Sequence, residues 1–118
     1  MNYTEWNVND KTMKLRLTTA GVMAVEDKLG KNPTDIFLAL SDGQLPKIRE
    51  VVLILHQALQ PFNSGYSVEK TANLLDSYFE EGHNVYELLT NELMQVFKNA
   101  GLLGQDVDNE EASESDPN

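Results

Sequence analysis

The stretch MKLRLTTAGVMAVEDKLGKNP, residues 13–33, decides the fold because it contains a change from strand to helix. Its first apolar residues, Met13, Leu15 and Leu17, alternate with polar ones, and a period of two is typical of a half-buried strand. From Thr18 onward the apolar residues recur every three or four positions, which is the spacing of an amphipathic helix. A strand followed directly by a helix predicts a mixed domain.

A second predicted strand precedes this stretch. Trp6 and Val8 share one of its faces, and Asn9-Asp10-Lys11 predicts the turn that joins the two strands into a hairpin. An isolated two-stranded hairpin is only marginally stable in water. Its apolar face must therefore pack on the segments that follow.

Five helices are predicted after the hairpin, because each apolar run is bounded by capping or helix-breaking residues. The third helix is apolar on most of its sides, and Leu45, Ile48 and Phe62 continue its apolar stripe. We therefore expect it to be the most buried helix, in a fold of class α+β that is mostly α. The predicted boundaries are Thr18 or Thr19 to Gly30, Asn32 to Gly43, Pro46 to Gln60, Ser67 to Gly82, and Asn84 to Gly101.

The negative charge is concentrated at the C-terminal end of the sequence. The chain has 118 residues and a formal net charge of −10, from 9 basic and 19 acidic residues. Six of the acids lie in residues 105–118, a segment without basic residues and with little apolar character, which predicts a disordered acidic tail. Residues 1–104 are expected to form one helical domain that is only mildly acidic.

The composition argues against several classes of function. The absence of cysteine excludes disulfides, thiolate zinc sites and cysteine nucleophiles. An acidic chain without a basic stripe is a poor binder of nucleic acid. The first residues show no signal-peptide pattern, and the longest apolar run, Val51–Leu55, is far shorter than a membrane-spanning helix. We expect a soluble cytoplasmic protein that binds neither nucleic acid nor membrane.

Few side chains have the setting that catalysis or metal binding requires. The histidine of the third helix lies among leucines, where a histidine is usually packed. The carboxylates near the end of the fourth helix share a face but gain no ligand from another segment, and the serines lie outside any nucleophile motif. We predict no enzyme, no catalytic residue, no cofactor and no metal. The side chains considered are His56; Asp76, Glu80, Glu81 and His83; and Ser64 and Ser67.

After these exclusions, the function class that remains for this chain is that of a binding protein. Aromatic residues and methionine are enriched at the cores of interfaces, and methionine suits surfaces that adapt to several partners. The candidates for partner binding are Met23, Tyr66, Tyr86 and Met94.

Three segments resemble a known family. They are LRLTTAGVMAVEDKLGKNP (residues 15–33), LLDSYFEEG (residues 74–82) and LMQVFKNAGLL (residues 93–103). They resemble small tail assembly chaperones of long-tailed phages of Gram-positive bacteria, which have relatives among the tail proteins of gene-transfer agents. The likeness covers residues 14–103, and it departs from the family pattern at Asp27, where a second glutamate is usual.

The resemblance implies a role without catalysis. Proteins of that family coat the long, helical and aggregation-prone tape measure protein during tail assembly, and they are displaced as the tail tube polymerises. The implied partner is the tape measure protein, with the tail tube protein as a second candidate, and self-association stays open. The family often makes a longer form by ribosomal frameshifting near the end of the gene.

Two other classes of function stay open. An acidic regulatory or DNA-mimicking protein of a mobile element would space its acids regularly over a folded surface, whereas most of the excess charge here lies in residues 105–118. A small metal-dependent enzyme would need converging ligands that the sequence does not identify.

Deletion of residues 105–118 should leave helicity and melting temperature nearly unchanged, because the segment has no apolar cluster that could pack on a core. Circular dichroism of the truncated and full-length chains measures both quantities. A clear loss of helicity in the truncated chain would show that this segment packs on the domain.

Overall fold

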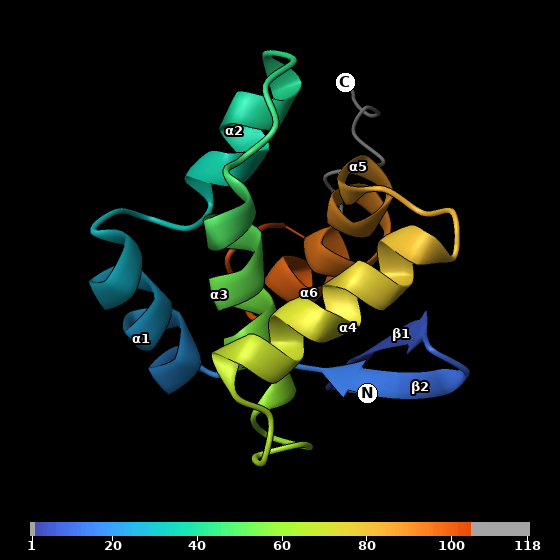
Figure 1. The fold of residues 1–118 in the computed structure, drawn as a ribbon. Helices are drawn as coiled ribbons and strands as arrows, with labels where there is room; N and C mark the ends of the chain where they lie inside the picture. Colours follow the sequence, from blue (N-terminus) through green and yellow to red (C-terminus); the bar gives the residue numbers. More distant parts are fainter. Residues whose placement is uncertain (1, 105–118) are drawn as a thin grey trace, which may run out of the picture.

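The structure, a computed structural model, describes residues 2–104. An antiparallel hairpin of two strands is followed by helices in a single domain, which confirms the predicted α+β, mostly helical class (Figure 1). The acidic tail predicted over residues 105–118 lies outside the described residues. No helix in the described part of the chain has the length and apolar character needed to cross a membrane. The elements are β1 (Thr4–Val8), β2 (Lys11–Leu15), α1 (Thr19–Leu29), α2 (Asp35–Ser41), α3 (Ile48–Leu59), α4 (Val68–Glu80), α5 (Val85–Glu87), the π-helical segment η1 (Leu88–Leu93) and α6 (Met94–Asn99).

The hairpin has a two-residue turn. Asn9 and Asp10 have φ angles of 56° and 59°, and paired left-handed residues match the twist of the two flanking strands. The predicted turn is therefore confirmed, except that Lys11 already belongs to β2. The register pairs Trp6 with Met13, and both side chains are buried, so one face of the hairpin is apolar as expected.

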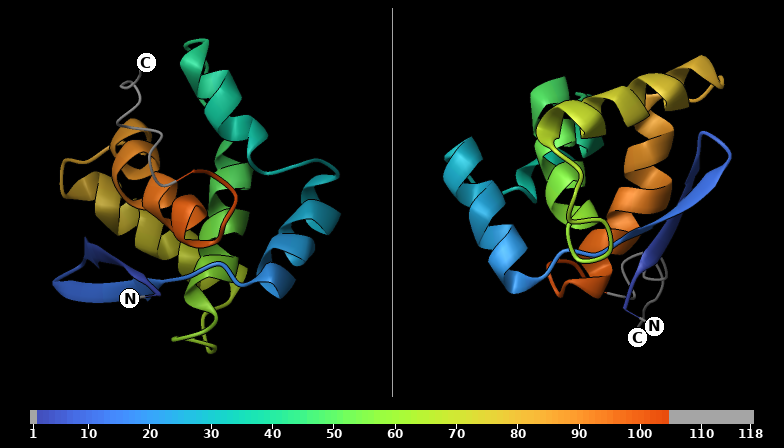
Figure 2. Two further views of the ribbon diagram at one scale, coloured as in Figure 1. Left: turned by 180° about the vertical axis from the view of Figure 1, so that it is seen from behind. Right: turned by 60° about the horizontal axis from the view of Figure 1, so that its bottom comes forward.

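The apolar face of the hairpin packs on the helices. The Trp6 ring meets the Tyr78 ring of α4 edge to face, with the ring centroids 5.5 Å apart. The chain then leaves β2, and the Arg16 backbone N–H donates to the Ala58 carbonyl of α3 at 2.8 Å. Figure 2 shows the hairpin beside α4 and the last helical segment. These contacts supply the cover that a two-stranded sheet needs.

Helix α1 begins and ends where its sequence predicts. The Thr18 hydroxyl oxygen accepts a hydrogen bond from the Gly21 backbone N–H at 3.0 Å, which caps the N-terminus. At the other end Gly30 has a φ of 70°, the left-handed conformation that terminates helices. Val22 and Val25 are buried on the side of α1 that packs on α3.

Helix α2 begins later than expected. The Asn32 side-chain oxygen accepts from the Thr34 backbone N–H at 3.0 Å and from the Thr34 hydroxyl at 2.8 Å. The predicted helix start at Asn32 is therefore wrong, because Asn32 caps only a turn and the regular helix starts at Asp35, with Thr34 as its N-cap residue. The helix is consequently only seven residues long.

Helix α3 is the centre of the fold, as predicted. It packs on α1, α4 and β2, and its residues 51–55 are all buried (Figures 1 and 2). The expectation that Leu45, Ile48 and Phe62 extend its buried stripe is wrong, because they are 58%, 50% and 41% exposed. The helix spans only Ile48–Leu59, so two of these residues lie outside it and the third lies at its first position.

The last predicted helix contains an irregular turn. Asn84 and Glu87 form the expected capping box, in which each side-chain oxygen accepts the other residue's backbone N–H at 2.9 Å. The segment then widens into η1 before it continues as α6. A π turn contains one extra residue, so Leu88 and Leu93, five positions apart, both face the core.

Leu55→Ala should lower the free energy of unfolding by about 2–5 kcal/mol, because truncation of a fully buried leucine leaves a cavity. The matched control is Leu38→Ala, at a leucine that is 67% exposed, and it should change stability by less than about 1 kcal/mol. Urea denaturation followed by circular dichroism measures both. Equal losses in the two variants would remove the assignment of α3 as the central helix.

Candidate functional site

The described part of the surface carries large apolar side chains that the core does not use. Single exposed apolar residues are ordinary, whereas a group of them marks an interaction site. Three of them, Leu38, Leu45 and Ile48, fall within eleven consecutive residues of the chain. The exposed large apolar side chains are Met23, Leu38, Leu45, Ile48, Phe62, Val68 and Tyr86.

Residues 35–48 form a projection that we call the α2–α3 tip. Helix α2 runs outward, Gly43 turns the chain with a φ of 81°, and the Gln44 backbone N–H donates to the Ala39 carbonyl at 2.9 Å. The chain then returns beside α2 to the start of α3 (Figure 1). The tip is attached through buried Ile36 and through Phe37, whose ring lies 4.9 Å from that of Phe97. Within residues 2–104, the apolar side chains of Leu38, Leu45 and Ile48 on the tip keep half or more of their surface exposed.

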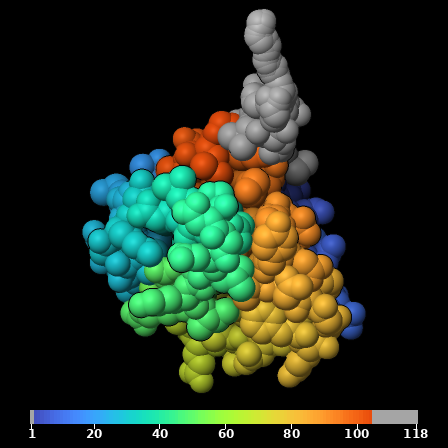
Figure 3. Space-filling view, turned by 90° about the horizontal axis from the view of Figure 1, so that it is seen from above, coloured from blue at the N-terminus to red at the C-terminus, as the bar shows by residue number. Residues whose placement is uncertain are grey.

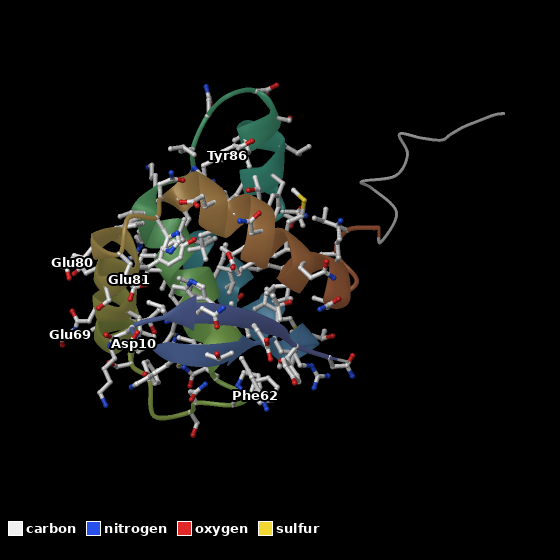
Figure 4. All side chains as sticks on the ribbon, turned by 90° about the vertical axis from the view of Figure 1, so that its right-hand side faces the viewer. Asp10, Phe62, Glu69, Glu80, Glu81 and Tyr86 are labelled. Atoms are coloured by element: carbon white, nitrogen blue, oxygen red, sulfur yellow. The ribbon has the colours of Figure 1, made fainter. Side chains whose placement is uncertain are left out.

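Met23 and Tyr86, two of the predicted binding residues, are both exposed. Met23 is 59% exposed on α1, and Tyr86 is 57% exposed on α5. The structure does not bring them together, because α1 and α5 lie on opposite sides of the α2–α3 tip when the molecule is seen from above (Figure 3). Figure 4 shows Tyr86 near the start of the last helical segment. They belong to two separate faces.

Tyr66 and Met94, the other two predicted residues, are half-buried. Tyr66 lines a surface pocket of about 280 Å³ together with Lys11 and Lys70, and its carbonyl accepts a hydrogen bond from the Gln60 side chain at 3.0 Å. Met94 lies one helical turn before buried Phe97. Both therefore offer a partner less apolar surface than Met23 and Tyr86 do.

A polar pocket of about 400 Å³ lies between the hairpin turn and the end of α4. The Glu81 carboxylate accepts a hydrogen bond from the Asn9 backbone N–H at 2.7 Å, so it ties the turn to the helix. His83 stacks on Tyr78 with the ring centroids 4.6 Å apart, and its Nδ1 lies 3.5 Å from a Glu87 oxygen. Figure 4 shows Glu81 at the hairpin turn. Glu81 and His83 thus have structural contacts that sequence reasoning missed.

The polar side chains that the sequence offers as candidate metal ligands do not converge into a metal site. Within residues 2–104, no group of three or more His, Cys, Asp or Glu side chains is arranged to hold a metal ion. Asp76 and Glu80 are exposed on α4. His56 is half-buried on α3, and its Nδ1 has no hydrogen-bond partner among the described residues. His56 therefore lies on a packed helix, and Asp76 and Glu80 lie on a solvent-exposed helix face.

Tyr78, which is buried, and Glu92, which is half-buried, are two titratable groups that interact electrostatically. Burial raises the pKa of Tyr78 to about 12, and the nearby carboxylates of Glu92 and Glu87 add to the rise. Burial also raises the pKa of Glu92, against a smaller lowering by a backbone hydrogen bond and by His83. One Glu92 oxygen is buried without a hydrogen-bond partner in the described part of the chain. The ionised carboxylate of Glu92 is therefore poorly solvated.

Glu92→Gln should raise the melting temperature at pH 7 and have a smaller effect near pH 4. A group whose pKa is higher in the folded protein stabilises the fold at low pH and loses that contribution as the pH rises through its pKa. Thermal melts at the two pH values measure the effect. Glu26→Gln, at an exposed carboxylate of α1, is the matched control. A Glu92→Gln effect that is no larger at pH 7 than at pH 4 would contradict the assignment.

Comparison with known proteins identifies the family of this chain. No curated protein and no solved structure matches this chain. One family model matches residues 4–116, which is nearly the whole sequence. The chain therefore belongs to the family of unknown function DUF6096.

Proposed function

We propose that the protein is a non-enzymatic chaperone of phage tail assembly that binds the tape measure protein and keeps it soluble. The observation that carries the proposal is the exposure of Met23 and Tyr86, at 59% and 57%, on helical segments whose other faces are packed. The identity of the partner comes from the resemblance of residues 14–103 to tail assembly chaperones.

A long helical partner suits this surface. An amphipathic helix is bound through apolar anchors that recur every three or four residues, and no catalytic group is needed. Met23 and Tyr86 each offer an anchor on a separate face of the molecule. One copy would therefore contact a long partner with one face and leave the other face for the next segment of the partner or for a neighbouring copy.

The charge of the chain supports a solubilising role. A protein with a net charge of −10 repels its like, so a partner coated with several copies resists aggregation. This effect acts at long range and requires no specific contact. It adds to the direct cover of apolar side chains.

Met23→Lys combined with Tyr86→Lys should weaken binding of the tape measure protein about tenfold or more, because charging an apolar anchor costs at least about 1.4 kcal/mol. The test is co-expression with the tape measure protein of the same gene cluster, with the soluble fraction of that protein as the readout. The fold should be intact, because both side chains are exposed.

The matched control is Ala20→Lys combined with Asn91→Lys, which adds the same charge at exposed positions of the same two helical segments. This control, together with His56→Ala and Glu80→Ala, should bind normally. Normal solubilisation by the Met23 and Tyr86 double variant would overturn the proposed function.

A further inference from the structure

The segment around the α2–α3 tip differs in charge from the rest of the chain. Residues 31–50 contain three bases and three acids and are neutral, whereas the whole chain carries −10. Two acidic copies repel each other over most of their surfaces. They repel least where the surface is neutral. The six charged residues of this segment are Lys31, Asp35, Asp42, Lys47, Arg49 and Glu50.

Two of these charges form an ion pair within the molecule. The Lys31 ammonium lies 2.7 Å from a Glu50 oxygen, and Asp35 also attracts Lys31. Among residues 2–104, four of the charges form no ion pair and are exposed: Asp35, Asp42, Lys47 and Arg49. Asp35 lies close enough to attract Lys31, which leaves Asp42 and the two bases for contacts outside the molecule.

The free charges lie at the two ends of the tip. Asp42 is at the outer end, directly before the Gly43 turn, and Lys47 and Arg49 lie where the returning chain reaches α3 (Figure 1). The exposed side chains of Leu38 and Leu45 come from the outgoing and the returning parts of the tip. The order from the outer end to the base is therefore acidic, apolar and basic.

Such an order is complementary to itself when one copy is turned end to end. A two-fold axis through the middle of the tip places Asp42 of each copy beside the bases of the other, and it places the leucines against each other. We propose that the α2–α3 tip is a self-association surface through which two copies of this chain pair about a two-fold axis. The proposal is independent of the proposed function, because it uses neither Met23 nor Tyr86.

The second copy fits this surface better than a cationic helical partner does. The bases at one end of the tip would repel a basic helix, whereas a second copy meets each free charge with its opposite. Ion pairs at an exposed rim add little affinity, so the apolar anchors supply most of it. The surface is small, and we expect a weak dimer that forms with rising concentration.

Sedimentation velocity of the full-length chain over a range of about 5–500 µM, which spans weak dimerisation, tests the proposal. The expected result is a shift from monomer to dimer. Leu38→Gln combined with Leu45→Gln should raise the dimer dissociation constant about tenfold or more, and Val68→Gln, at an exposed apolar residue of α4, should not change it. A chain that is monomeric throughout would overturn the proposal, as would a dimer unaffected by the two leucine substitutions.

Charge reversal gives the sharper test. Asp42→Lys makes both ends of the tip basic, and Lys47→Glu combined with Arg49→Glu makes both ends acidic. Each variant alone should dimerise more weakly than the wild type, because like charges then meet across the axis. An equimolar mixture should dimerise again, because each end of one variant meets its opposite on the other. Both variants keep a net negative charge, so their pairing cannot result from overall attraction between oppositely charged proteins.

Asp27→Lys, at an exposed acid of α1, changes the net charge as Asp42→Lys does and should leave the dimer intact. Loss of the dimer in this control, or failure of the mixture to dimerise, would overturn the proposal. Circular dichroism of each variant confirms the fold, and recovery in the mixture itself shows that both variants are folded. A monomeric wild type whose leucine variants fail to solubilise the tape measure protein would assign the tip to that partner instead.

Discussion

The contact between the Trp6 and Tyr78 rings joins the hairpin to the helices, and the other parts of the fold depend on it. Trp6 is fully buried, and Tyr78 also stacks on His83 at the end of α4. Without this cover the hairpin would be marginally stable, since it has only two strands. The packing of β1 on α4 also places the hairpin turn where Glu81 can accept its hydrogen bond.

The sequence allowed prediction of those features that depend on neighbouring residues. The hairpin turn, the Thr18 cap of α1 and the Asn84–Glu87 capping box are set by local hydrogen bonds, and the structure has them. The periodicity of α3 also identified the central helix. It could not show that the helix begins only at Ile48, so the same periodicity places Leu45 and Ile48 in the core although they are exposed.

The features that involve residues distant in the chain were missed. The hydrogen bond between Asn9 and Glu81 joins residues 72 positions apart, and nothing local distinguishes this glutamate from Glu80. The burial of one Glu92 oxygen was also missed. Among the predicted binding residues, Met23 lies beside the apolar stripe of its helix, and its exposure follows from that position. The half-buried state of Met94 had no such signal.

The π-helical segment η1 has a consequence for how related sequences align. A π turn is a helical turn that contains one residue more than a turn of α-helix. Removal of an exposed residue such as Asn91 would leave Leu88 and the present Leu93 four positions apart, a spacing that still places both on one face of a regular α-helix. Members of the family that differ in length by one residue at this place can therefore share the same core. A single-residue gap in an alignment over residues 88–93 would be a change of helix type and not a break in the fold.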